Sequence, residues 1–240
     1  ASGAALVEAS DQVIDKGKIA AAHILESAAD DIEFRNGRFS IAGTDRAIGI
    51  VELARRIRQS AKLPSGVPDT LDVDHMMAGV PSTFPNGAQV AEVEIDPDTG
   101  ETKVVSYVGV NDFGTIVNPL IVAGQVHGGI VQGLGQALME RAIYNEEGQL
   151  ITGSFMDYAL PRAADVPPIQ LESLPSPTAT NPLGVKGCGE AGCAAGLPTI
   201  VNAVIAALAD EDIHHLDMPL TPEKIWAAIV EARAARKTSA

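Results

Sequence analysis

Two glycine-rich segments of this 240-residue chain contain the side chains best suited to chemistry. The first, G-Q-V-H-G-G-I-V-Q-G-L-G-Q at residues 124–136, combines the amide of Gln125 with glycines in an apolar, helix-like run. Backbone N–H groups left bare by glycine at the start of a helix can bind an anion such as a phosphate. Tight packing against another helix also explains these glycines, because glycine lets two backbones approach closely. The spacing by itself leaves both interpretations open.

The second segment, G-V-K-G-C-G-E-A-G at residues 184–192, places Glu190 between small residues just before a predicted helix. A carboxylate at this position can cap the free N–H groups of the helix. It can also act as a general base, because Gly189 and Ala191 leave room for a large cofactor to approach. Lys186 lies four residues before Glu190 and can meet a phosphate or pair with that carboxylate.

The elements that must position these segments indicate an α+β chain with mixed helices and antiparallel-rich sheets. Alternating apolar residues predict a strand over 88–96, a turn, and a returning antiparallel strand that ends near Asp112. Asp112 is expected to stabilise the turn that follows this strand. The rest of this part is predicted to form helices over 120–140, 197–210 and 222–236, with proline-rich extended chain over 161–182.

The first part of the chain is predicted to form a separate helix and hairpin sub-domain. Asn36-Gly37 is a strong hairpin signal, because both turn positions need positive φ. A stretch rich in proline and glycine over 63–85 then favours a boundary, which we place between residues 80 and 81. The elements expected before it are a helix over 9–29, a hairpin over 32–43 and a helix over 47–60.

Composition excludes several classes of function. The net charge of −14 argues against binding to nucleic acid or to an anionic membrane. No apolar run reaches the roughly 18–20 residues of a membrane span, and no signal segment opens the chain, so we expect no membrane insertion and a cytoplasmic location. Cys188 and Cys193 cannot hold an iron–sulfur cluster alone, and we expect both to be small buried apolar side chains. The five histidines show no zinc-site spacing.

Several separated motifs, in order, resemble one known family. The segments GQVHGGIVQGLGQALME, TGSFMDYALPRA and TNPLGVKGCGEAG are similar to the molybdopterin-binding large subunit of the xanthine dehydrogenase and aldehyde oxidase family. The bacterial branch that contains carbon monoxide dehydrogenase large chains looks most alike. The resemblance covers nearly the whole chain but only the C-terminal part of that subunit. It implies a molybdenum-cofactor-binding domain of this type, with residues 81–240 as the C-terminal molybdopterin-binding sub-domain and residues 1–80 as a remnant of the larger subunit.

The resemblance also implies roles for individual residues. Glu190 matches the catalytic glutamate of the K-G-x-G-E-x-G loop, which acts as general base, and Gln125 matches the glutamine of the G-Q-x-x-G-G motif, which hydrogen-bonds the cofactor. For His127, contact with cofactor phosphates and packing on a helix face both stay open. No protein ligand to the metal is expected, because in this family the pterin dithiolene holds it. The other residues expected to contact the cofactor are Gly124, Val126, His127, Gly128, Gly129, Lys186, Gly187 and Gly189.

The implied activity is that of a molybdenum hydroxylase, an oxidoreductase that oxidises or hydroxylates a small carbon substrate with oxygen from water. Its cofactor is expected to be molybdopterin in the cytosine dinucleotide form. Expected partners are the N-terminal half of the molybdopterin subunit, an iron–sulfur small subunit and an FAD-binding medium subunit, and we expect the isolated chain to be inactive. The alternative is a non-catalytic fragment or split subunit that serves only folding, completion of the cofactor domain or partner binding.

Overall fold

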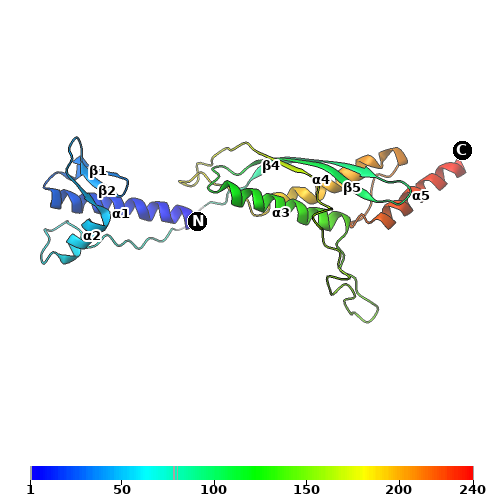
Figure 1. Cartoon of the computed structure of the whole chain (residues 1–240), viewed down its shortest axis with the longest axis horizontal. Helices are drawn as coiled ribbons and strands as arrows, with labels where there is room; N and C mark the ends of the chain where they lie inside the picture. The colour runs from blue at the N-terminus through cyan, green and yellow to red at the C-terminus, as the bar shows by residue number, and fades with distance from the viewer. Residues whose placement is uncertain (1, 78, 80, 240) are drawn as a thin grey trace. The chain divides into compact units, whose positions relative to one another are not determined.

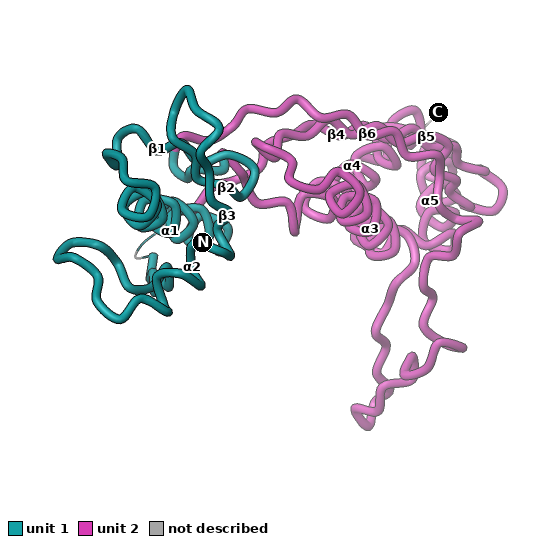
Figure 2. Tube along the Cα trace, turned by 60° about the vertical axis from the view of Figure 1, so that its left-hand side comes forward, with its two compact units in different colours: residues 1–81, 180–183 teal, residues 82–179, 184–240 magenta. Residues whose placement is uncertain are grey.

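The computed structural model describes residues 2–77, 79 and 81–239, and its contacts divide the chain into two compact units. One unit contains residues 1–81 with 180–183, and the other contains 82–179 with 184–240 (Figure 2). Each unit has its own apolar core. The predicted boundary between residues 80 and 81 includes residue 80, which lies outside the described residues, so it stays a prediction.

The first unit combines two helices with a small antiparallel sheet. Its elements, in chain order, are α1 Ser2–Leu25, η1 Ala29–Asp31, β1 Ile32–Arg35, β2 Arg38–Ile41, β3 Ala47–Gly49 and α2 Ile50–Gln59. The strand order is β1-β2-β3, and both pairs are antiparallel. The residues of its core that are almost fully buried include Phe39, Leu53 and Ile57.

Turn chemistry explains the predicted hairpin, and strand pairing explains one error. Asn36 and Gly37 have φ values of 49° and 74°, as a type I′ turn requires, so the hairpin is confirmed. The helix predicted over 47–60 begins only at Ile50, because residues 47–49 pair with β2 and bury Ile48.

The first helix is longer at its start than predicted. The sequence predicts a helix over 9–29, whereas α1 already begins at Ser2 and ends at Leu25. The next residue, Glu26, has a φ of 55°, a left-handed conformation that a right-handed helix cannot include. The helix therefore ends before the predicted position.

The second unit places two helices against a three-stranded sheet. Its elements are β4 Asn86–Ile95, β5 Thr102–Asp112, α3 Pro119–Leu138, β6 Ile169–Ser173, α4 Ala191–Ala207, η2 Ala209–Glu211 and α5 Pro222–Ser239. The strand order is β4-β5-β6; β4 pairs antiparallel with β5, and β6 pairs parallel with it. The helix α4 packs on β4, and α3 packs along α4 (Figure 1). The predicted α+β class with antiparallel-rich sheets is confirmed.

Two elements of the second unit differ from their predictions. The strand β6 lies within the segment predicted as extended chain, and its parallel partner β5 is far away in sequence. The helix predicted over 197–210 begins at Ala191 and ends at Ala207, with Pro198 inside it. Its first turns consist of alanine, glycine and cysteine, which carry little hydrophobic periodicity, and packing on α3 accounts for the extra length.

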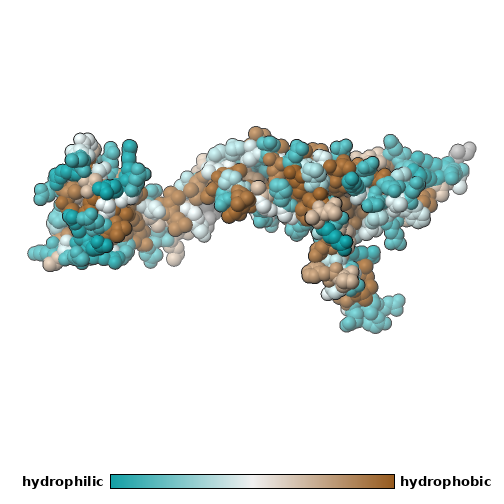
Figure 3. All heavy atoms as spheres, viewed as in Figure 1, coloured by the Kyte–Doolittle hydropathy of each residue, from teal (hydrophilic) through white to brown (hydrophobic). Residues whose placement is uncertain are grey.

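The segment between α3 and β6 extends away from the rest of the second unit (Figure 1). We call residues 140–165 the arm. Figure 3 shows hydrophobic residues on it. Phe155 and Met156 are 85% and 93% exposed. The other large apolar residues exposed on the arm are Tyr144, Leu150, Ile151 and Leu160.

Candidate functional site

The start of α3 meets the loop that precedes α4. Asn118 caps α3, because its side-chain oxygen accepts a hydrogen bond from the backbone N–H of Ile121 at 3.1 Å. One turn further along, Gln125 Nε2 donates to the carbonyl oxygen of Gly189 at 2.7 Å. This hydrogen bond joins residues 64 positions apart and brings the two predicted chemical segments together.

Glu190 lies at the N-terminal end of α4 with its side chain exposed. Its carboxylate makes no capping hydrogen bond to the helix, so the capping interpretation is wrong. Within the part of the chain that the structure describes, the carboxylate forms neither a hydrogen bond nor an ion pair. A carboxylate with no described partner, next to the residue that Gln125 hydrogen-bonds, is a candidate proton acceptor.

The glycines of α3 divide into two groups. A Cβ atom at Gly129 would lie 2.7 Å from the backbone nitrogen of Cys193, and one at Gly133 would collide with the α4 backbone in the same way. Helix packing therefore explains these two glycines. By contrast, a Cβ atom at Gly124 or Gly128 would meet nothing within 4 Å. That face of α3 is bare and can admit a ligand to the backbone.

Lys186 pairs with Asp112 and not with Glu190. Its Nζ lies 2.5 Å from Asp112 Oδ2, and the Lys186 and Asp112 side chains are only 13% and 15% exposed. The other carboxylate oxygen of Asp112 accepts from the backbone N–H groups of Gly114 and Ser176 at 2.8 and 2.9 Å. Lys186 first, and then these N–H groups, lower the pKa of Asp112 to about 2. The predicted turn role of Asp112 is confirmed, and a phosphate contact by Lys186 would compete with this ion pair.

The low pKa of Asp112 predicts acid sensitivity of this loop. Folding lowers the pKa from 3.8 to about 2, so the stabilisation is complete above pH 4 and is lost as the pH falls toward 2. At pH 6 the unfolding temperature of the wild type should be higher than that of Asp112→Asn. The difference between the two temperatures should shrink as the pH falls from 4 to 2. Asp217→Asn, at an exposed side chain, is the control. A difference that stays constant with pH would contradict this expectation.

The remaining predicted site residues lie in different surroundings. Val126 is 1% exposed and belongs to the core of the second unit, which leaves only its backbone for a ligand contact. His127 is exposed, and its Nδ1 hydrogen-bonds the carbonyl oxygen of Ala123 at 2.7 Å within α3. Gly187 and Gly189 are exposed in the loop before α4.

The two cysteines lie beside the site and are not joined in a disulfide. Cys188 packs partly buried against the apolar core of the second unit, and burial raises the pKa of its thiol. Cys193 Sγ lies 3.5 Å from the carbonyl oxygen of Glu190, as a donor within the first turn of α4. The apolar role predicted for Cys188 agrees with this packing.

Gln89 on β4 is a site residue that the sequence analysis missed. Its Nε2 donates to the carbonyl oxygen of Ala191 at 3.1 Å, and its Oε1 accepts from the hydroxyl of Tyr107. Gln89 lies on the inward face of β4, in series with three apolar residues. A glutamine in a series of otherwise apolar inward positions is the sequence signal that could have identified this residue. The apolar residues of the series are Ala91, Val93 and Ile95.

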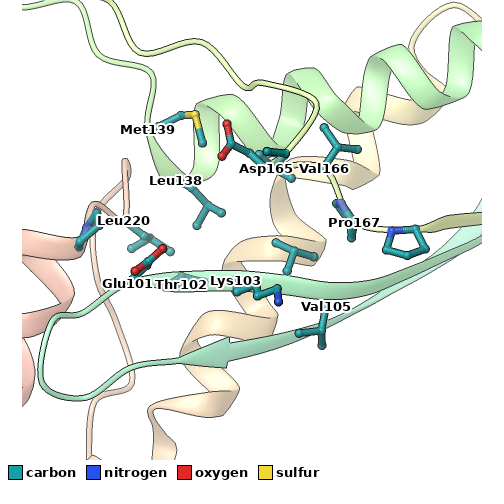
Figure 4. Close-up of a pocket in the computed structure, with 15 residues that line it drawn as sticks. Glu101, Thr102, Lys103, Val105, Leu138, Met139, Asp165, Val166, Pro167 and Leu220 are labelled. Carbon is teal, nitrogen blue, oxygen red and sulfur yellow. The ribbon is translucent and has the colours of Figure 1, made fainter.

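A cavity of 710 Å³ lies at the other end of α3, at the edge of the sheet. Figure 4 shows Leu138 and Met139 on one side of it and Thr102 and Lys103 on the other. Leu138 lies 13 residues after Gln125, which is about 20 Å along a helix at 1.5 Å per residue. This cavity is therefore separate from the site of Gln125 and Glu190.

The described residues contain neither a metal-binding cluster nor a membrane-spanning helix. No group of three or more His, Cys, Asp or Glu side chains among them could hold a metal ion. None of the helices in that part of the chain is both long and apolar enough to cross a membrane.

Comparison with known proteins decides the family. A family model described as a molybdopterin cofactor-binding domain matches residues 1–167, which include Gln125. The chain belongs to this family. Glu190 lies after residue 167 and so outside the region matched by the family model. Individual relatives align with most of the chain.

Two curated relatives and one solved structure are similar to this chain over most of its length. The 6-hydroxypseudooxynicotine dehydrogenase complex subunit gamma of Paenarthrobacter nicotinovorans is 37% identical over 229 residues, 94% of this chain and 28% of the relative. The carbon monoxide dehydrogenase large chain of Hydrogenophaga pseudoflava is 32% identical over 231 residues, which cover 96% of this chain and 28% of the relative. A crystal structure of Cu,Mo-CO dehydrogenase in its carbon monoxide reduced state has a TM-score of 0.86 at 31% identity, covering 97% of this chain and 29% of that one.

These matches confirm the resemblance to the carbon monoxide dehydrogenase branch and the molybdenum-cofactor-binding fold. The chain spans about 28% of the length of these curated relatives.

Proposed function

We propose that this chain forms part of the cofactor site of a molybdenum hydroxylase, with Glu190 as general base and Gln125 as cofactor ligand. One observation carries the proposal. The hydrogen bond from Gln125 to Gly189 attaches the bare end of α3 to the residue before Glu190, whose exposed carboxylate has no partner among the described residues. A base and a ligand-binding surface are then neighbours, although they come from distant parts of the sequence.

The residues at this surface fit a molybdopterin cofactor. Gly124 and Gly128 have no side chain and nothing within 4 Å of where a Cβ would lie, so a flat, phosphate-bearing molecule can approach the backbone. Gln125 uses its Nε2 on Gly189, and its amide oxygen can accept an N–H of the pterin. When bound, the cofactor supplies the redox chemistry that removes two electrons from the substrate.

Glu190 supplies proton transfer in this proposal. As oxygen from water passes to an electron-poor carbon, a carboxylate within reach takes up the proton that the water loses. Glu190 suits this task because its carboxylate is not used in a helix cap or an ion pair with a described residue. The hydrogen bond at Gly189 holds the backbone next to it.

The wider features of the enzyme belong to the same proposal. They are a small carbon substrate, molybdopterin in its cytosine dinucleotide form, partner chains with FAD and iron–sulfur clusters, and a cytoplasmic location. The names of the relatives suggest two substrates to try first: carbon monoxide and 6-hydroxypseudooxynicotine. We expect the chain by itself to be inactive, because its site faces solvent.

Co-expression tests the proposal. The chain is produced alone, and also together with polypeptide equivalent to the rest of the large subunit and with the partner chains. Molybdenum, pterin and turnover are then measured. We expect molybdenum and pterin in the assembled sample and no tight retention by the purified 240-residue chain. Stoichiometric metal in the chain alone would refute a shared site. A loaded assembly that oxidises no substrate would favour the non-catalytic alternative.

A further inference from the structure

Three successive backbone carbonyl groups around Glu190 are each held by a different element. The oxygen of Gly189 accepts from Gln125 of α3 at 2.7 Å, and the oxygen of Ala191 accepts from Gln89 of β4 at 3.1 Å. The oxygen of Glu190 itself accepts from the N–H of Ala194 at 2.9 Å, within α4. The backbone on both sides of the carboxylate is thus attached to a glutamine amide.

The amide of Gln89 has only one orientation that satisfies both of its partners. The carbonyl oxygen of Ala191 can only accept, so it requires the Nε2 of Gln89. The Oε1 of Gln89 can only accept, so the hydroxyl of Tyr107 must donate to it. Tyr107 is fully buried in the core. A flipped amide would lose the bond to Ala191, because two carbonyl oxygens cannot hydrogen-bond each other.

The start of α4 has a reason to need such external support. Pro198 has no N–H group, so the carbonyl of Ala194 lacks its usual intrahelical donor. Gly192 and Gly196 add backbone freedom in the same turns. The hydrogen bonds from Gln89 and Gln125 attach this weakened segment to β4 and α3.

We propose that Gln89 is a positioning residue, which acts through the Ala191 carbonyl to fix the direction of the Glu190 carboxylate. The Ala191 carbonyl sets the orientation of the Gln89 amide, and the hydroxyl of buried Tyr107 holds its other end. This inference rests on the proposed role of Glu190 as base. In this role Gln89 affects the chemistry through the backbone at residues 189–191.

The test uses the assembled enzyme with Gln89→Leu, Gln89→Glu and Tyr107→Phe. Glutamate at position 89 keeps the side-chain length but cannot donate to Ala191, so both Gln89 variants should lower kcat by about 10- to 100-fold. KM and molybdenum content should stay unchanged. The solvent deuterium isotope effect on kcat should rise, because proton transfer becomes slower when the base is misplaced. Tyr107→Phe, which removes only the hydroxyl, should show the same change to a smaller degree.

Controls separate this inference from the proposal on which it rests. Gln170→Leu, at an exposed glutamine of β6 in the same sheet, should leave kcat and the isotope effect unchanged. If Glu190→Gln abolishes turnover but both Gln89 variants keep wild-type kcat and isotope effect, the positioning role is wrong and the base stands. Loss of molybdenum from the Gln89 variants, with normal kcat per bound metal, would also overturn the positioning role. If Glu190→Gln retains full turnover, the proposed base and this inference both fall.

Discussion

Replacing Glu190 by Gln in the assembled enzyme should lower turnover by roughly 10²- to 10⁴-fold, the usual contribution of a general base. The amide has the same shape as the carboxylate but cannot take up a proton. Because the side chain has no hydrogen bond to the α4 cap and no ion-pair partner among the described residues, the change breaks no contact there. Turnover should therefore fall while molybdenum, pterin and the unfolding temperature stay at wild-type values.

Glu172→Gln is the matched control for this experiment. Glu172 is an exposed carboxylate on β6 of the same unit, so its loss should not change turnover. Retained activity in Glu190→Gln would refute the assigned base. A fall in cofactor content equal to the fall in activity would instead make Glu190 a binding residue.

Replacing Gly129 by Ala should destabilise the chain by about 1–3 kcal/mol, the usual cost of adding atoms to a packed interface. The new Cβ would lie 2.7 Å from the nitrogen of Cys193 and 2.8 Å from the Cα of Gly192. Both are backbone atoms, so the two helices must separate. Urea unfolding of the chain, followed by circular dichroism, measures the free energy of unfolding.

The neighbouring glycine should give the opposite result. A Cβ at Gly128 meets nothing within 4 Å, and Ala favours a helix over Gly by about 1 kcal/mol, so Gly128→Ala should leave stability equal or higher. In the assembled enzyme the same variant should retain less pterin, because the added methyl group covers the bare face of α3. Equal destabilisation by Gly128→Ala and Gly129→Ala would contradict the division of the glycines into two groups.

The sequence predicts the elements whose signals are local. Asn36-Gly37 determines its own turn, and the alternation over 88–96 corresponds to β4. The strands β3 and β6 have only three and five residues, and β6 pairs with a strand distant in sequence, so no local pattern reveals them. The start of α4 was missed because its small residues are held in a helix by contact with α3.

The candidate site shows the same limit. The motifs select Gln125 and Glu190, and the structure brings their segments together through Gly189. The motifs do not reveal which residues from other elements form hydrogen bonds and ion pairs with these segments. Sequence spacing offered Glu190 as a partner for Lys186, whereas the fold pairs that lysine with Asp112 from the end of β5. Polar contacts between distant elements depend on the fold, which a pattern of nearby residues does not contain.

The arm has a consequence for anyone who handles this chain in the laboratory. Side chains such as Phe155 and Met156 stand almost fully in water, and large exposed apolar patches promote association between molecules. A preparation of the chain alone is then best kept dilute, or in a mild detergent, during purification. Yield and solubility at high concentration therefore show whether the apolar side chains of residues 140–165 are buried against another molecule, and they do so without an assay for catalysis.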